Sequence, residues 1–323
     1  MELFKYKKPY NFMGLSRKFG ILSAVLIILS WGIIMVKGFN YGIDFAGGTL
    51  IQVKYERKAP IKEIRAKLSQ YPEFKDASVT YFGSDDEVVI RTKTSTKSVK
   101  NDVGAKISNI LKSTGKLEIR RVDMVGPKIG NELREKGLTA TLLAILGILI
   151  YVSIRFEWRF ALASVMALIH DVSIALGAIA LFRIDVNLDI LAAILTLLGY
   201  SLNDTIIVFD RIREGIRTIK NPSLSHIINE SITKTLSRTT LTSLTTFFVV
   251  LTLFIFGGEI IYGFSFTLLI GIIVGTYSSI FIASPVLMWL GFDVREFRAK
   301  EAEKLKREKE REKMRAMYEQ GTL

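Results

Sequence analysis

Six stretches of this sequence are apolar enough, and long enough, to cross a lipid bilayer. A helix needs about 20 predominantly apolar residues to span the hydrocarbon core. Because the bilayer offers no hydrogen-bond partners to the backbone, each spanning stretch must be helical. The sequence therefore predicts an α-helical polytopic membrane protein with six transmembrane helices. The six stretches are residues 19–36, 138–154, 160–182, 188–210, 239–257 and 262–290.

The charge balance narrows what such a protein can do. Lys and Arg together number 44 against 31 Asp and Glu, which gives a net charge of +13. Nucleic-acid binding would explain a basic chain, but no nucleic-acid-binding motif accompanies the charge. Retention of basic loops on the cytoplasmic side of a membrane explains it better.

No metal, cofactor or enzymatic activity is expected. The chain has no cysteine and two histidines, which excludes disulfides, thiolate metal sites and a multi-histidine metal site. It lacks the G-x-x-x-x-G-K-[ST] phosphate loop and any constellation of a nucleophile with its base. Any ATP hydrolysis must therefore come from another protein.

The positions of Lys and Arg predict how the six helices are oriented. Basic residues gather in residues 1–18, in the loop after the second span, in residues 211–238 and in the tail 291–323. These parts are expected in the cytoplasm, and residues 37–136 outside. The first span resembles a signal peptide without a cleavage site, which predicts an uncleaved anchor in the cytoplasmic (inner) membrane.

Two of the expected cytoplasmic segments have helical patterns of their own. Between Leu224 and Leu236, apolar residues share one side of a helix, which we expect to lie along the membrane interface within the 211–238 loop. The tail from Arg295 to Glu319 mixes both charge signs. It is expected to be a solvated helix, with contact to anionic lipid or a cytoplasmic partner as the alternative.

The external segment has the pattern of one small α+β domain. Alternating or β-rich runs predict strands at 49–55, 77–82, 87–92 and 117–125. Helical spacing predicts helices at 60–70 and 98–113, and Gly83 to Asp86 predicts a hairpin turn. The order βαββαβ is that of the ferredoxin-like fold. Because many functions use this fold, it does not identify an activity.

Polar residues inside the apolar spans are the candidate functional residues. Asp204 lies in the fourth span with Ser201, Asn203 and Thr205 as supporting polar residues, and Asp171 follows His170 in the third span. An ionisable side chain at that depth costs about 3 kcal/mol or more, so its default interpretation is functional. The alternative is that both carboxyl groups only hydrogen-bond neighbouring helices and hold the bundle together.

A proton-transfer mechanism follows from these residue types. A carboxylate in a dehydrated bundle is costly when charged, which favours uptake of a proton, whereas a nearby cation favours its release. Arg238 opens the hydroxyl-rich fifth span. If a conformational change moved Arg238 toward or away from Asp204, the site would alternately release and take up a proton. The cluster from Asp210 to Glu214 lies at the membrane edge and is expected to anchor the helix end through ion pairs.

Five stretches of the sequence have the character of family motifs. The longest is Tyr200 to Glu214, and the Leu236 to Thr239 stretch follows it. The others are residues 40–49, with the sequence NYGIDFAGGT, residues 125–130 and residues 170–172. Together these stretches span almost the full chain, and they resemble the SecF family, the smaller membrane subunits of bacterial protein-export complexes.

The resemblance implies one half of an RND-type transporter. In that case Asp204 lies on a proton path, Arg238 is the functional arginine of the fifth span, and Asp171 matches an acidic position of the third span. SecD would be the partner, with the SecYEG translocon and a translocating unfolded polypeptide. The proton-motive force would drive movements of the external domains. Expected hinge or motif residues are Gly42, Asp44, Gly47, Gly48, Gly126 and Pro127.

Two other functions stay open at this point. The first is a self-sufficient RND-like exporter of small molecules or lipids, built from two copies of the chain. An external domain of about one hundred residues is small for a drug-binding porter, which argues against it. The second is an assembly factor that only stabilises a translocon and moves no protons.

Overall fold

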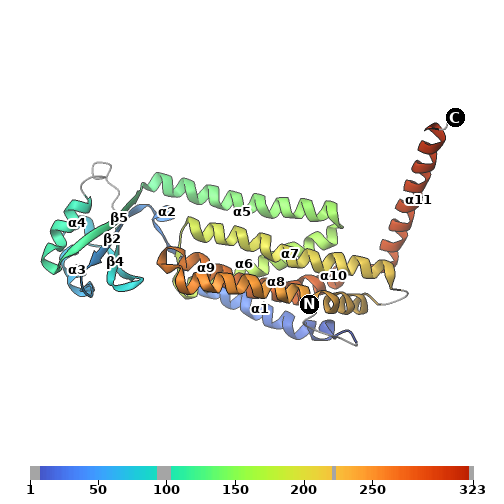
Figure 1. Ribbon diagram of the computed structural model, residues 1–323, viewed down its shortest axis with the longest axis horizontal. Coiled ribbons are helices and arrows are strands. Elements are labelled where there is room, and N and C mark those ends of the chain that lie inside the picture. Colours follow the sequence, from blue (N-terminus) through green and yellow to red (C-terminus); the bar gives the residue numbers. More distant parts are fainter. Residues whose placement is uncertain (1–7, 93–102, 220–222, 320–323) are drawn as a thin grey trace.

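The computed structural model describes residues 8–92, 103–219 and 223–319. Within these ranges, six helices are long and apolar enough to cross a membrane, which confirms the predicted class. Figure 1 shows them as an elongated bundle with a small domain at one end. The helices are α1 (Phe12–Lys37), α5 (Pro127–Arg155), α6 (Trp158–Leu181), α7 (Leu188–Thr218), α8 (Leu224–Phe256) and the sixth span. That last span consists of α9 (Gly258–Ser278), the π-helical turn η3 (Ser279–Ala283) and α10 (Ser284–Trp289).

The fourth and fifth helices are longer than the sequence predicted. The prediction of a separate interfacial helix within residues 211–238 is wrong, because α7 continues to Thr218 and α8 already begins at Leu224. Ser223 caps α8, and no Gly or Pro interrupts the sequence from there to Phe256, so nothing ends the helix before the span. The apolar face that suggested an interfacial helix is buried in the bundle core, through Ile227, Ile228 and Ile232.

Glycines set how closely the sixth span packs against α7. A methyl group on Gly271 would lie 2.2 Å from Leu197 Cδ1, and one on Gly275 would lie 3.0 Å from Ser201 Cβ. A small-xxx-small pair of this kind lets two helix backbones approach closely. The pair therefore packs within the chain, and it brings α9 against the segment of α7 that precedes Asp204.

The domain at the end of the bundle, which the sequence predicts to lie outside and which we call the external domain, has the predicted ferredoxin-like topology. Its elements are β2 (Gly48–Tyr55), α3 (Ile61–Leu68), β3 (Ser78–Phe82), β4 (Ser84–Thr92), α4 (Val103–Leu111) and β5 (Leu117–Val125), with 3-10 turns η1 (Pro72–Phe74) and η2 (Lys112–Thr114). The four strands form an antiparallel sheet in the order β3-β4-β2-β5. One face packs against α3 and α4, because Ile51 and Val53 share a core with Ile64 and Ile107.

One detail of the domain, the hairpin turn, differs from the sequence prediction, and part of one predicted helix lies outside the described residues. The hairpin turns at Gly83 alone, with φ of +73°, and β4 already begins at Ser84, so the expected four-residue turn is wrong. A positive φ is a conformation that glycine adopts without steric cost. The first residues of the helix expected at 98–113 fall outside the described residues.

Short segments connect the domain to the bundle. β1 (Asn40–Tyr41) pairs in parallel with β6 (Asp185–Val186), which lies between α6 and α7. The small helix α2 (Ile43–Ala46) then packs against the start of α5: a methyl group on Gly130 would lie 3.0 Å from the Gly47 nitrogen. Gly126 alone separates β5 from α5. The root of the domain therefore touches two spanning helices directly.

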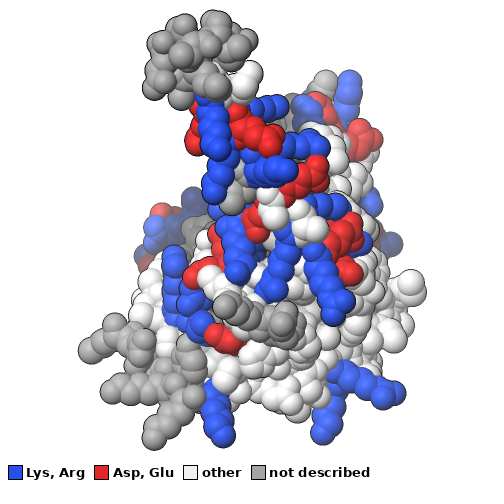
Figure 2. Space-filling view, turned by 90° about the vertical axis from the view of Figure 1, so that its right-hand side faces the viewer, with Lys and Arg blue, Asp and Glu red and all other residues white. Residues whose placement is uncertain are grey.

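The other end of the bundle carries the described parts of both termini. The charged helix α11 (Val294–Glu319) projects away from the spans there (Figure 1). At its base, Arg298 Nε donates to the Ile216 carbonyl at 2.7 Å, and Arg217 pairs with Glu301. Figure 2 shows Lys and Arg side chains distributed over this end of the molecule.

Candidate functional site

Asp204 lies in the bundle interior where α7, α8 and α9 meet. Its side chain is fully buried, and Oδ2 accepts a hydrogen bond from Ser243 Oγ at 3.1 Å. Oδ1 has no partner among the described residues. Thr276 Oγ1, on α9, lies 2.7 Å from Ser243 Oγ and 2.8 Å from the Ile272 carbonyl oxygen. Asp204, Ser243, Thr276 and that carbonyl form a continuous chain across three helices.

This chain can run in either direction, because each hydroxyl has one proton and can both donate and accept. With Asp204 ionised, Thr276 donates to Ser243, and Ser243 donates to the carboxylate. With Asp204 protonated, the carboxyl donates to Ser243, Ser243 to Thr276, and Thr276 to the Ile272 carbonyl. The 2.7, 2.8 and 3.1 Å separations fit both arrangements. The geometry therefore accommodates Asp204 in either protonation state.

Asp171 has a different environment, although it is as deeply buried. Its Oδ2 accepts from Ser201 Oγ at 2.5 Å and from Ser278 Oγ at 2.8 Å. Its Oδ1 lies 2.8 Å from His170 Nδ1. Three potential donors from α6, α7 and α9 thus surround this carboxyl. A carboxyl group with three hydrogen-bond partners from three helices is held in one position. The π-helical turn η3 begins directly after Ser278, and such turns are frequent at functional sites.

The two carboxyl groups therefore suit different tasks. Asp171 has three partners and holds α6, α7 and α9 together. Asp204 has one partner and a second oxygen that is free to bind a proton or water. Asp204 is the better candidate for proton exchange.

His170 extends the Asp171 cluster toward α1. Its ring stacks on Tyr277 with centroids 5.8 Å apart, and its Nε2 is buried without a partner in the described chain. The Tyr277 hydroxyl donates to the Phe19 carbonyl at 2.8 Å and lies 2.8 Å from Ser23 Oγ. A polar path thus connects α6 with the first span.

The other predicted site residues are placed unevenly. Ser201 and Thr205 are buried beside the carboxyl groups, whereas Asn203 and Arg238 are exposed on the outside of α7 and α8. Among the described residues Arg238 has no ion pair, and Asp204 has none either. The structure therefore does not bring Arg238 to Asp204.

The cluster that follows Asp204 on α7 lies near the end of the bundle that carries the termini. Arg211 Nη1 lies 2.6 Å from Glu214 Oε2, and Asp210 Oδ1 lies 3.5 Å from Arg155 Nη2. These ion pairs agree with the interpretation of Asp210 to Glu214 as an anchor for the helix end.

Sequence reasoning did not single out three residues of the site. Ser243 was one of many hydroxyl residues at the start of the fifth span, and Thr276 and Ser278 were not distinguished at all. Ser and Thr are common at helix contacts in membranes, so their presence alone carries little information. What identifies them is the rotation of α8 and α9 about their axes, which places their hydroxyls beside the two carboxyls.

The predicted motif residues connect the external domain to the start of α7. Asp44 Oδ2 accepts a hydrogen bond from the Leu188 amide at 3.0 Å, which satisfies the first N–H of α7. Asn187 Oδ1 accepts from the Ile190 amide, also at 3.0 Å. The Gly42 amide donates to the Val186 carbonyl at 2.9 Å. First-turn N–H groups have no partner within the helix, so carboxylate and amide oxygens stabilise this end.

Glycine and proline at the other motif positions allow tight junctions. Gly47 has φ of +71°, and a methyl group there would lie 2.9 Å from Pro127 Cα. Gly48 also has a positive φ, of +130°. Gly126 precedes α5, and Pro127 occupies its first turn, where its missing N–H costs nothing.

An ion pair links the body of the external domain to the same place. Arg91, at the end of β4, pairs with Asp185 in β6, and Asn40 donates to the other carboxylate oxygen of Asp185. We call Arg91, Asp185 and Asn40 the Asp185 cluster. Burial raises the pKa of Asp185, although the charges of Arg91 and Arg183 act to lower it. The desolvation of this carboxylate therefore affects its pKa more than the positive charges of Arg91 and Arg183 do.

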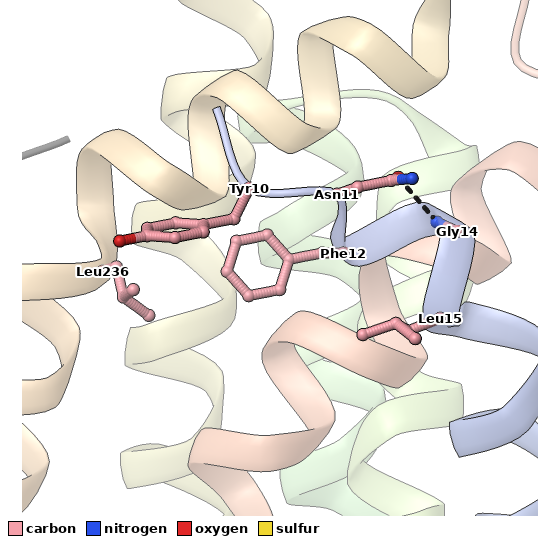
Figure 3. A pocket seen from close by; sticks show the side chains of 6 residues that line it. All are labelled: Tyr10, Asn11, Phe12, Gly14, Leu15 and Leu236. Carbon is pink, nitrogen blue, oxygen red and sulfur yellow. Dashed lines mark hydrogen bonds between the residues drawn. The ribbon is translucent and has the colours of Figure 1, made fainter. Parts of the chain in front are cut away.

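Other parts of the described chain offer no competing site. No group of three His, Cys, Asp or Glu residues in these ranges could hold a metal ion. A groove lies where the segment before α1 meets α1 and α8 (Figure 3). Its lining has no carboxyl, imidazole, amino or guanidinium group; the lining residues are Tyr10, Asn11, Phe12, Gly14, Leu15 and Leu236.

Comparison with protein families matches both the bundle and the motif loop. The family model described as protein export membrane protein SecD/SecF, C-terminal, matches residues 106–293, and the SecD/SecF GG motif matches residues 32–59. The chain is 51% identical to protein translocase subunit SecF of Helicobacter pylori strain J99, with both chains covered in full. It is 46% identical to SecF of Vibrio alginolyticus, over 90% of this chain and 92% of that one.

Solved structures of similar proteins support the same family assignment. The crystal structure of SecDF, a translocon-associated membrane protein from Thermus thermophilus, superposes with a TM-score of 0.81 at 34% identity. The match covers 90% of this chain and 40% of the SecDF chain, which is therefore much longer. A SecDF structure in a super-membrane-facing form gives a TM-score of 0.67, over 94% of this chain and 41% of that one.

Fold and site together define a polytopic membrane transport subunit, in which a ferredoxin-like domain is inserted between the first and second of six spans. The chain belongs to the SecF family of protein translocase subunits.

Proposed function

We propose that this chain works with a SecD subunit to couple the proton-motive force to late steps of polypeptide translocation through the SecYEG translocon. The observation that carries the proposal is the environment of Asp204. Its carboxyl is fully buried, has one free oxygen, and ends a hydroxyl chain that suits either protonation state. Moving one charge across the membrane potential is worth about 2.3 kcal/mol per 100 mV, enough to drive a change between two bundle arrangements.

The helix that carries Asp204 also reaches the external domain. Asp44 binds the first N–H of α7, and Asp204 lies roughly 24 Å further along the same helix at 1.5 Å per residue. A shift or tilt of α7 when Asp204 gains or loses a proton would therefore move the root of the domain. Gly42, Gly47, Gly48, Gly126 and Pro127 are the proposed hinge positions. One of the two similar SecDF structures is described as a super-membrane-facing form, and it superposes on this chain with a TM-score of 0.67 against 0.81 for the other.

A partner subunit accounts for the polar residues that this chain leaves exposed. Gly199 and Asn203 face outward on α7, a methyl group on Gly199 would meet nothing within 4 Å, and Arg238 is exposed on α8. An Asn and an Arg facing hydrocarbon would be costly, whereas both are satisfied at a helix–helix interface. We place the SecD spans against this face. Arg238 acts in the proton cycle at that interface, and Asp171 supports it by fixing the three inner helices.

The proposal also includes the membrane in which the protein lies and the orientation of its helices in that membrane. The protein is a multi-pass protein of the cytoplasmic (inner) membrane, with both termini in the cytoplasm and residues 37–136 outside. The basic side chains at the end of the bundle that carries the termini support this orientation through the positive-inside rule (Figure 2).

The test is export in vesicles that contain this chain, SecD, SecYEG and an ATP-driven motor. The change Asp204→Asn keeps the size of the side chain but removes its exchangeable proton. We expect it to abolish the stimulation of export by a proton gradient, while ATP-driven export persists. The matched control is Asp210→Asn, because Asp210 is an exposed carboxylate on the same helix. Normal proton-stimulated export by the Asp204→Asn protein would contradict the proposal.

A further inference from the structure

Among the described residues, Arg213 near the end of α7 has no ion pair, whereas the arginines on either side of it do. Arg211 pairs with Glu214, and Arg217 pairs with Glu301. Arg213 uses one nitrogen, Nη1, to donate to a backbone carbonyl at 3.0 Å. Because a guanidinium carries five N–H groups, several donors of Arg213 are open to a further partner.

A second guanidinium, that of Arg155 at the end of α5, lies beside Arg213. The carbonyl that Arg213 binds belongs to Arg155. The guanidinium carbons of Arg155 and Arg213 lie 5.4 and 5.9 Å from the centroid of one ring, that of Phe156. Stacking uses the face of a guanidinium, so the N–H groups at its edge can still donate. One phenyl ring thus orients two arginines where α5 meets α7.

Positive charge exceeds negative charge around these two arginines. The charges that act on Arg213 are those of Arg155, Arg217, Asp210 and Glu301. Glu301 already pairs with Arg217, and Asp210 Oδ1 lies 3.5 Å from Arg155 Nη2, which is long for an ion pair. Three guanidiniums therefore share two carboxylates, and this excess favours an additional anion that has several acceptor oxygens.

An apolar surface begins directly beside the two arginines. Figure 1 shows α5 along the outside of the bundle. Its outward residues recur every three or four positions and have exposed fractions of 49% to 82%: Leu143, Leu146, Ile150 and Ile154. We call these four residues the α5 stripe. The stripe is roughly 16 Å long at 1.5 Å per residue, which is about half of a hydrocarbon core of about 30 Å. It therefore extends over one leaflet and ends next to Arg155.

We propose that Arg155 and Arg213 bind the phosphate of an anionic phospholipid whose acyl chains lie along the α5 stripe. Arginine binds phosphate oxygens through bidentate hydrogen bonds, and basic pockets between spanning helices bind lipid head groups. Trp158, three residues after Arg155, is 53% exposed, and tryptophan is enriched at the depth of the head groups. The lipid joins α5 to α7 at the end of the bundle away from the external domain. The proposal does not depend on Asp204 or on proton coupling.

The test is lipid binding by the full chain in complex with SecD, measured in detergent by native mass spectrometry. The probes are phosphatidylglycerol, which is anionic, and phosphatidylcholine, which has no net charge. We expect the double change Arg155→Gln and Arg213→Gln to weaken phosphatidylglycerol binding by about tenfold or more and to leave phosphatidylcholine binding unchanged. The matched control is Arg307→Gln with Arg311→Gln, because both arginines are exposed on α11 at the same end of the molecule. A loss of the same size in that control would overturn the proposal.

Two further comparisons separate a built lipid site from simpler explanations. Arg213→Lys keeps the charge but loses the planar fork and its stacking on Phe156, so we expect it to weaken phosphatidylglycerol binding. Full binding by that variant would show that general attraction, and not this geometry, holds the lipid. An excess of inorganic phosphate should not displace phosphatidylglycerol, because the free ion cannot use the α5 stripe. Displacement would show that the arginines take free phosphate, which also overturns the proposal.

Fluorescence tests the same site without changing the arginines, and it decides if the double variant does not assemble. In nanodiscs, brominated phosphatidylglycerol should quench the emission of Trp158 more than brominated phosphatidylcholine does at the same mole fraction. The difference between wild type and Trp158→Phe isolates this residue from Trp31 and Trp289. Equal quenching by the two lipids, or unchanged phosphatidylglycerol binding in the double variant, overturns the inference.

Discussion

At the scale of single residues, the number of hydrogen bonds separates the two buried aspartates. Both lie in the bundle interior, and an uncompensated charge there is costly. Asp171 has three polar neighbours that can donate to it, whereas Asp204 has one and keeps a free oxygen. The first arrangement fixes the carboxyl group of Asp171 in position, whereas the second leaves one oxygen of Asp204 open to another partner.

This difference predicts contrasting effects for two similar serine variants. Ser278→Ala removes a donor to Asp171, and we expect it to lower the free energy of unfolding by about 1.5–3 kcal/mol, as for other hydrogen bonds to charged groups. Proton-stimulated export should largely survive, because Asp204 is untouched. Ser243→Ala removes the link between Asp204 and Thr276, and it should impair proton-stimulated export with less effect on stability. Thermal unfolding in detergent and export in vesicles measure the two quantities; a reversed pattern would contradict the assignment.

At the scale of helices and strands, the sequence predicted which elements exist better than where they end. The six spans follow from apolar runs, and strands such as β5, at residues 117–125, follow from alternation. The start of α8 was missed because a helix continues through the membrane surface when no Gly or Pro stops it. The pairing of Asp204 with Ser243 could not be predicted, because it depends on how α8 is rotated against α7, which no local pattern specifies.

The Asp185 cluster gives a prediction at the same scale. Because burial raises the pKa of Asp185, this carboxyl binds its proton more tightly when the domain is docked than when the domain is released and the pKa returns to the ordinary value of about 3.9. The contribution of this group to docking is therefore largest at low pH and is lost as pH rises through the raised pKa. The groups that act on this carboxyl are Arg91, Arg183 and Asn40.

Spin labels measure this directly, because the chain has no natural cysteine to remove. With labels at Lys112→Cys in the domain and Ile260→Cys on α9, we expect the distance distribution to narrow as pH falls. In Asp185→Asn the pH dependence should vanish, while Asp123→Asn, in β5 of the same domain, serves as the control. A pH response that persists in Asp185→Asn would show that another group controls docking.

At the scale of the whole molecule, the chain resembles one subunit of a larger complex. The helices α6 to α9 hold the two buried carboxyl groups and their partners, and the outward face of α7 and α8 exposes Asn203, Gly199 and Arg238, where we place SecD. At the end of the bundle next to the domain, Asp44 and the Asp185 cluster connect the domain to α7 and to the loop before α7. The family, the six spans and the βαββαβ domain could be predicted from sequence. The connection from Asp204 through α7 to the domain required the structure, since Asp44 and Leu188 lie far apart in the chain.

The central claim is that the protonation state of Asp204 sets the position of the external domain. The most direct test is the distance distribution between labels at Lys112→Cys and Ile260→Cys, measured in the complex with SecD at one fixed pH. We expect Asp204→Asn, which mimics the protonated carboxyl, to shift the distribution relative to wild type, and Asp210→Asn to leave it unchanged. Identical distributions for wild type and Asp204→Asn would contradict the account.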